Sequence, residues 1–134
     1  MKKTEILPSA VSFLLLFAFL IAFIPAPRAY AADASGVCGK EGDDLTWSYS
    51  KGVLTVAGQG EMADYEREED IPWGDVRSEI ARIELPEGLT RVGSRAFMAC
   101  VELTSVELPE SLTGIGEYAF YFCAGLTSIE FPGA

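Results

Sequence analysis

Residues 106–120 read VELPESLTGIGEYAF and residues 83–97 read IELPEGLTRVGSRAF, so one pattern occurs twice with a spacing of 23 residues. Extending the alignment in both directions gives full copies at 80–102 and 103–125 and a partial copy at 126–134. A fixed period of this length predicts a stacked solenoid, in which each copy buries its apolar positions against its neighbours. Those positions are the first, fourth and sixth of each copy: Ile80, Leu103, Leu126, Ile83, Val106, Ile129, Leu85, Leu108 and Phe131.

Each copy is expected to begin with a short strand that turns its apolar side chains inward. Gly93 and Gly116 then occupy the same position of the two full copies, where a tight turn would lead to the convex side. The segments that follow, SRAFMAC at 94–100 and EYAFYFC at 117–123, are each expected to form a helical turn. Matching residues would fill the rest of the interior: Leu89, Leu112, Val92, Ile115, Ala96, Ala119, Phe97, Phe120, Cys100 and Cys123.

The pattern LTSVELPESLTGIGEYAFYFC at 103–123 resembles the BspA-like leucine-rich repeats, and the resemblance covers residues 80–134. Residues 37–79 also resemble the segment that often precedes such arrays. The resemblance implies an α/β leucine-rich-repeat solenoid of about two and a half repeats with an N-terminal β-rich cap. It also implies a secreted or cell-surface protein that adheres to host proteins or to other cells. Family members usually carry many more repeats than this chain.

The N-terminal segment 1–31 has the layout of a secretory signal peptide. Lys2 and Lys3 precede an apolar run at 10–24, and small residues at 29 and 31 provide a cleavage site before Ala32. The run is shorter than the roughly 20 apolar residues that a membrane span needs. We therefore expect export and cleavage, with no membrane span in the mature chain. An uncleaved N-terminal anchor is the alternative.

Residues 32–79 are expected to form an N-terminal β-hairpin cap and an acidic loop. In LTWSYS at 45–50 alternate residues share one face, VLTVAG at 53–58 supplies a second strand, and Lys51-Gly52 lies between them. An array must cover its terminal apolar face, and the residues suited to that role are Trp47, Leu54, Val56, Met62 and Trp73. The aromatic content also supports an alternative, a carbohydrate-binding module that uses Trp47, Trp73 and Tyr65.

The segment EMADYEREED at 61–70 is the most acidic part of the chain. Carboxylate oxygens are ligands for calcium, but the spacing of an EF-hand is not present. We expect a solvated acidic loop, with no metal site and no cofactor. Its acidic residues are Glu61, Asp64, Glu66, Glu68, Glu69 and Asp70.

Strand positions that point away from the core define a candidate binding surface, which we call the concave face. Glu84, Glu107 and Glu130 recur at one such position, so their carboxylates would form a row with the ~4.8 Å spacing of adjacent strands. Their repulsion in water is about 1 kcal/mol per neighbouring pair, and Arg82 would relieve one end of the row. The row would favour a basic partner surface, and a merely solvated face is the alternative. The concave face consists of Arg82, Glu84, Ser105, Glu107, Ser128 and Glu130.

Three cysteines, Cys38, Cys100 and Cys123, raise the question of disulfide pairing. Cysteines of exported proteins are expected to pair, but an odd number leaves at least one unpaired. Cys100 and Cys123 occupy the same position of adjacent copies, so their Cα atoms would lie within disulfide range while parallel side chains hold the Cβ atoms slightly too far apart. We expect two buried free thiols there, and Cys38 either free or paired outside the chain.

Composition disfavours several classes of function. The chain has no histidine, which excludes a Ser-His-Asp triad, a Cys-His pair and a histidine metal site, and its cysteines lack C-x-x-C spacing. The spacing marks no pair of carboxylates for glycosidase chemistry. The formal charge of −10 disfavours nucleic-acid binding, which needs clustered Lys and Arg. We expect no enzymatic activity.

These observations predict a secreted or surface-exposed module for protein interaction or adhesion, with a protein partner on a host or cell surface. An alternative follows from the partial copy at 126–134, because no outer segment follows its strand. About three repeats are usually needed for a stable array. In that alternative the chain is the N-terminal fragment of a larger surface protein whose enzymatic or cell-wall-attachment function lies downstream.

Overall fold

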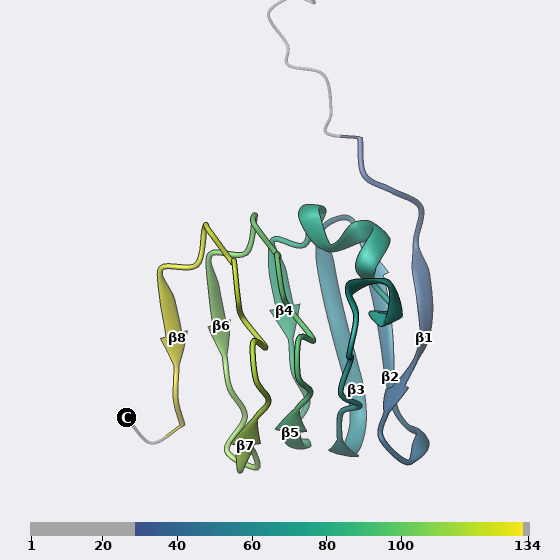
Figure 1. Cartoon of the computed structure of the whole chain (residues 1–134), viewed down its shortest axis with the longest axis vertical. Coiled ribbons are helices and arrows are strands. Elements are labelled where there is room, and N and C mark those ends of the chain that lie inside the picture. The colour runs from purple at the N-terminus through teal and green to yellow at the C-terminus, as the bar shows by residue number, and fades with distance from the viewer. Residues whose placement is uncertain (1–28, 133–134) are drawn as a thin grey trace, which may run out of the picture.

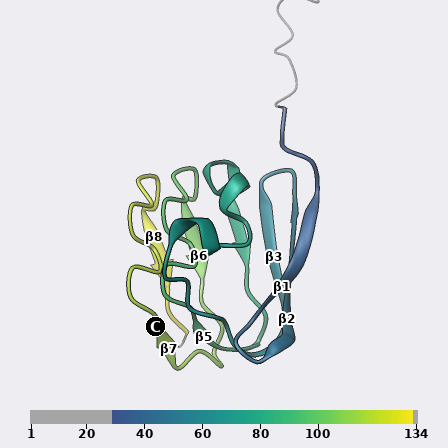
Figure 2. The same cartoon turned by 45° about the vertical axis from the view of Figure 1, so that its right-hand side comes forward.

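The computed structural model describes residues 29–132, so the predicted signal peptide lies outside the described residues except for positions 29–31. The described chain consists mainly of short strands stacked side by side, with two 3₁₀ helices packed near the N-terminal end of the stack (Figures 1 and 2). β1 lies at one end of the stack and β8 at the other (Figure 1). The array therefore has a capped end formed by residues 34–61 and an opposite end formed by the last copy.

The cap is a three-stranded antiparallel unit of β1 (Ala34–Gly39), β2 (Gly42–Ser50) and β3 (Val53–Glu61). Lys51 and Gly52 connect β2 to β3 with φ values of 47° and 83°, and two positive φ values are what a type I′ hairpin turn requires. The hairpin prediction is thus confirmed, whereas β1 was not predicted. The cap buries its inner residues Leu45, Trp47, Tyr49, Leu54 and Val56.

β3 connects the cap to the repeats because it pairs with two later strands. Its first residues pair in parallel with β4 (Arg82–Glu84), and its last residues pair in parallel with β5 (Gly88–Val92). β5 continues the same sheet to β7 (Gly114–Ile115). β6 (Ser105–Glu107) pairs with β8 (Ser128–Glu130) in a separate two-stranded sheet. Each full copy therefore contributes two strands, where the sequence predicted one.

The convex segments are successive turns, so the predicted helical turns at 94–100 and 117–123 are wrong. Arg95, Ala99, Tyr118 and Phe122 have φ between 58° and 63°, a left-handed conformation that costs a non-glycine residue roughly 1–2 kcal/mol. Hydrogen bonds between coils offset this cost. In the first copy the backbone N–H groups of residues 95, 97 and 99 donate to the carbonyls of residues 117, 119 and 121 at 2.8–2.9 Å.

Two 3₁₀ helices, η2 (Glu68–Asp70) and η3 (Gly74–Glu79), are the helical elements of the described residues. Both lie between the cap and the first copy, and η3 buries only Val76. The fold is therefore a repeat solenoid with an N-terminal β-rich cap, as predicted. The α part of the predicted α/β class is not confirmed, because turns replace helices on the convex side.

One continuous hydrophobic core runs from the cap through both full copies. Its centre is a column of rings, in which Trp73 stacks on Phe97 with 5.7 Å between centroids and Phe97 packs on Phe120 with 5.5 Å between centroids. The inward positions of the first two copies are buried or half-buried, as predicted, except for Ile115, which is 40% exposed because it lies near the open end of the array. At the far end Leu126 and Ile129 are only partly buried, and Phe131 is 58% exposed.

Candidate functional site

The six residues of the concave face lie on three neighbouring strands, and all six are exposed. Strand alternation explains this, because the central residue of each strand points into the core while its two neighbours point outward. Parallel pairing places Ser105 opposite Ser128 and Glu107 opposite Glu130. β4 lies next to β6, on the side of β6 that faces away from β8 (Figure 1). The structure therefore brings the predicted residues together on one surface.

A groove of about 500 Å³ runs over β4 and β6 on this surface, and it is lined by four of the six residues, Arg82, Glu84, Ser105 and Glu107. The groove lies where the backbone ladder is interrupted, since β4 belongs to the six-stranded sheet and β6 to the separate pair with β8. Glu87 also lines the groove. Sequence reasoning missed Glu87 because it follows the strand and its proline, outside the alternation that identified the other residues.

The charge of the concave face is predominantly negative. Arg82 Nε lies 3.3 Å from Glu84 Oε1, so the expected relief at one end of the row is present. Both side chains are exposed, and an ion pair of this kind contributes at most about 1 kcal/mol. Within residues 29–132, no cation lies in ion-pair range of Glu107 or Glu130. Two of the three carboxylates are thus available to a cationic partner.

The acidic segment at 61–70 is partly neutralised by nearby cations. Lys40 Nζ lies 2.8 Å from Glu61, Arg77 lies 2.7 Å from Glu68, and Arg67 pairs with both Glu69 and Asp70. Across the described part of the chain, no group of three or more Cys, Asp or Glu side chains is arranged to hold a metal ion. These contacts favour the interpretation of the segment as a charged surface loop.

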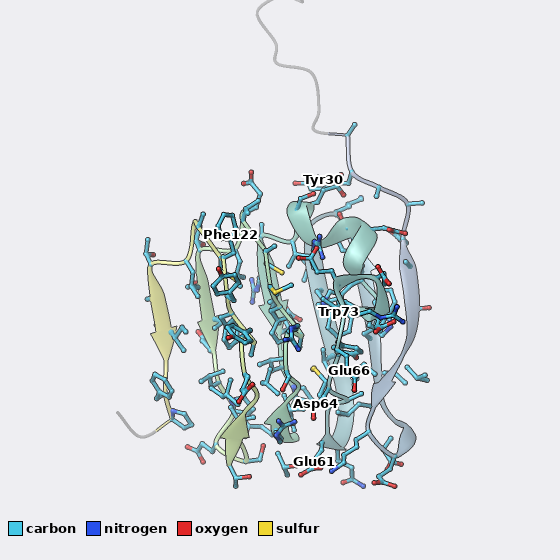
Figure 3. All side chains as sticks on the ribbon, viewed as in Figure 1. Tyr30, Glu61, Asp64, Glu66, Trp73 and Phe122 are labelled. Atoms are coloured by element: carbon cyan, nitrogen blue, oxygen red, sulfur yellow. The ribbon has the colours of Figure 1, made fainter. Side chains whose placement is uncertain are left out.

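Asp64 has a different role from its acidic neighbours, because it joins the cap segment to the first copy (Figure 3). Its Oδ1 accepts hydrogen bonds from the backbone N–H of Ser94 and from Arg91 Nη1, both at 2.7 Å. These two donors, with the Ser94 N–H the stronger influence, lower the pKa of Asp64 from its ordinary value of 3.8. Asp64 therefore stabilises the turn that begins the convex segment.

The carbohydrate-binding alternative is wrong for the residues on which it was based. Trp47, Trp73 and Tyr65 are all buried, with 7%, 1% and 6% of their surfaces exposed. Trp73 contacts the other two rings edge-on and donates from Nε1 to the carbonyl of Ala96 at 2.8 Å. A ring packed inside the core has no free face for stacking on a sugar, so these residues act as the cap.

All three cysteines are free thiols, as expected for Cys100 and Cys123. Cys38 and Cys100 are buried, whereas Cys123 is only half-buried. The two repeat cysteines lie side by side, because Cys123 Sγ and the backbone N–H of Cys100 both donate to the carbonyl oxygen of Phe97, at 3.1 and 3.4 Å.

An exposed aromatic patch on the convex side was not predicted. Tyr118, Tyr121 and Phe122 are 54%, 56% and 67% exposed, and Arg95 lies over the Tyr118 ring at 5.3 Å. Figure 3 labels Phe122. The sequence could have revealed this patch, because aromatic residues in the second copy replace Arg95, Met98 and Ala99 of the first copy.

No helix within residues 29–132 is long and apolar enough to cross a membrane.

Comparison with known proteins agrees with this geometry. The family model of the BspA-type leucine-rich repeat region, which spans six copies, matches residues 76–134. A crystal structure of a leucine-rich repeat protein from Eubacterium ventriosum is similar to 75% of this chain, with 29% sequence identity and a TM-score of 0.66. The match covers 26% of that protein, so this chain spans about a quarter of its length. No curated protein matches this chain. Residues 76–134 match the model of the BspA-type leucine-rich repeat family, so the repeat region of this chain is of that type.

Proposed function

We propose that this chain is a surface-displayed protein-interaction module that binds a basic protein surface through its concave face. The observation that carries the proposal is the row of exposed carboxylates on β4, β6 and β8, held on strands whose central residues pack into the core. The strand backbones fix the positions from which the carboxylates project. A backbone held in place by the core loses little conformational entropy when a partner binds.

The shape of the site favours a macromolecular partner over a small molecule. The groove is an open surface feature, whereas small-molecule sites usually enclose most of their ligand. Leucine-rich repeat domains generally mediate protein binding, and the family is typically non-catalytic. Adhesion to a cell or host surface is the form of this function that we propose, since BspA-type proteins are usually surface proteins.

The spacing of the carboxylates on the concave face indicates what kind of partner would fit it. The paired strands β6 and β8 place Glu107 and Glu130 about 4.8 Å apart. On a helix, lysines three and four residues apart are separated along the axis by about 4.5 and 6 Å. A basic helical stripe would therefore match the row closely. Arg82 does not prevent binding, because its exposed ion pair with Glu84 contributes little energy and a cation of the partner can take its place.

The experiment uses a helical peptide with lysines at alternating spacings of three and four residues as the probe, and measures its affinity for the protein at several salt concentrations. The affinity should fall as salt rises, because screening weakens exposed charge pairs. Charge reversal in Glu84→Lys/Glu107→Lys should weaken binding roughly tenfold or more.

The matched control is Glu66→Lys/Glu102→Lys, which changes the net charge equally at exposed positions outside the concave face. It should retain most of the affinity. If both double variants lose affinity equally, the peptide responds to net charge alone and the concave face is not the site. Unchanged binding in Glu84→Lys/Glu107→Lys would show that the surface has been misplaced.

A further inference from the structure

Cys100 and Cys123 lie side by side on successive coils. They occupy the same position of the two full copies. Cys123 Sγ donates to the carbonyl oxygen of Phe97 at 3.1 Å, and the backbone N–H of Cys100 donates to the same oxygen at 3.4 Å. The side chain of Cys123 therefore reaches back to the coil that carries Cys100.

The backbone around the two cysteines holds the coils at a spacing that permits a crosslink. Phe97 N–H donates to the carbonyl of Ala119 at 2.9 Å, and Ala99 N–H donates to that of Tyr121 at 2.8 Å. Coils joined by such bonds lie about 4.8 Å apart. This falls within the ~4.4–6.8 Å between Cα atoms that a disulfide accepts. The spacing of the coils is therefore compatible with a disulfide between the two positions.

We propose that Cys100 and Cys123 are a thiol–disulfide exchange site, at which a small disulfide such as glutathione disulfide converts the pair into a covalent link between the two coils. Access supports this assignment, because Cys123 is half-buried and can meet the oxidant while Cys100 is enclosed behind it. The third cysteine, Cys38, is buried in the cap and serves as an internal control.

The reaction has two steps. The Cys123 thiolate attacks one sulfur of glutathione disulfide, which forms a mixed disulfide on Cys123 and releases one glutathione thiolate. Cys100 then loses its proton and attacks Cys123 Sγ, which forms the Cys100–Cys123 bond and releases the second glutathione. The protein loses two electrons and two protons, and glutathione disulfide is reduced to two glutathione thiols.

The electrostatic environment agrees with this order of events. The neighbouring Cys100 lowers the pKa of Cys123 from its ordinary value of 9.0, which favours the Cys123 thiolate. The neighbouring Cys123, followed by burial, raises the pKa of Cys100. Burial also raises the pKa of Cys38 from 9.0 to about 11. Cys123 is therefore the nucleophile that meets the oxidant.

The test equilibrates the reduced protein, expressed from the full reading frame, with mixtures of reduced and oxidised glutathione, and blocks the remaining thiols with maleimide. Digestion after glutamate places Cys100 on peptide 88–102 and Cys123 on peptide 118–130. We expect these two peptides to appear as one disulfide-linked species in oxidising mixtures, with Cys38 labelled by maleimide only after denaturation. The rate of oxidation should rise with pH, because the attacking species is the Cys123 thiolate.

Two variants separate the roles of the cysteines. Cys100→Ser should retain one glutathione on Cys123, because the resolving thiol is missing. Cys123→Ser should remain unmodified in the folded state, because Cys100 is enclosed. The proposal is overturned if the native protein keeps both thiols free in fully oxidising mixtures, or if Cys38 supplies one end of the link. The wild-type peptide map decides the question even where a variant fails to fold.

Discussion

Trp73 joins the cap to the repeats through two kinds of contact. Its ring stacks on Phe97, the first aromatic residue of the repeat column, and its Nε1 donates to the Ala96 carbonyl. Only 1% of the residue is exposed. A single side chain thus fills core volume and also satisfies a backbone acceptor of the next coil.

Replacing Trp73 with phenylalanine should separate these two contributions. Trp73→Phe keeps an aromatic ring against Phe97 but leaves the Ala96 carbonyl without its donor, so we expect a loss of about 1–3 kcal/mol in the free energy of unfolding. Trp73→Ala also removes the ring and should cost about 3–5 kcal/mol. Urea unfolding followed by circular dichroism measures both. Equal losses for the two variants would mean that ring volume is unimportant here.

At the scale of elements, the contact between Asp64 and the turn at Ser94 ties the acidic loop to the first copy. The folded-state pKa of Asp64 lies below its ordinary value. A lowered pKa stabilises the folded state fully above the unfolded value, and this stabilisation is lost as pH falls through the folded value. The contact should therefore weaken only in acid.

Asp64→Asn should remove this pH-dependent stabilisation. Above about pH 5 the variant should be less stable than the wild type by less than about 1 kcal/mol, because the carboxylate is exposed and screened. The difference should shrink as pH falls from 3.8 through the lower folded-state pKa, where the wild-type carboxylate also becomes protonated. Urea unfolding of the wild type and of Asp64→Asn across this pH range tests the prediction, with Glu66→Gln as the control at an exposed position. A difference that does not change with pH would exclude the ionised carboxylate as its source.

For the whole molecule, the continuous core implies that cap and repeats unfold together. Both tryptophans lie in the cap region, and Cys100 lies in the first full copy. Tryptophan fluorescence and labelling of Cys100 by a short maleimide pulse therefore report different parts of one cluster. In the reduced protein both should change at the same urea concentration, as a two-state transition requires.

Mapping the label to peptide 88–102 distinguishes Cys100 from the other thiols in that experiment. A fluorescence change that precedes the labelling would mean that the cap and the repeats are separate cooperative units. The core would then be continuous in space, but its two parts would not unfold together.

Several features of this protein were predictable from sequence because they depend on local patterns. The 23-residue period located the strands at 82–84, 105–107 and 128–130, and strand alternation assigned Glu84, Glu107 and Glu130 to the exposed side. Turn chemistry at Lys51-Gly52 located the hairpin. Each of these inferences needs only neighbouring residues, or the same residue one period later.

The remaining features were decided by tertiary structure, because they depend on which segments meet after folding. Left-handed turns replaced helical ones on the convex side, where hydrogen bonds to the next coil compensate for unfavourable φ values. The pairing of β3 with both β4 and β5 created a second row of strands that the repeat pattern did not reveal. Aromatic residues of the cap are buried although their composition also suited a sugar site.

The sequence by itself thus determined the repeat, its register and the outward row of carboxylates, since periodicity specifies which side of a strand each residue occupies. Only the tertiary structure decided that the groove lies at the break between β4 and β6, and that Cys123 Sγ and the Cys100 N–H share the carbonyl oxygen of Phe97. The physical reason is that a period identifies equivalent residues in successive coils. The distance and direction between their side chains depend on how the coils pack and hydrogen-bond.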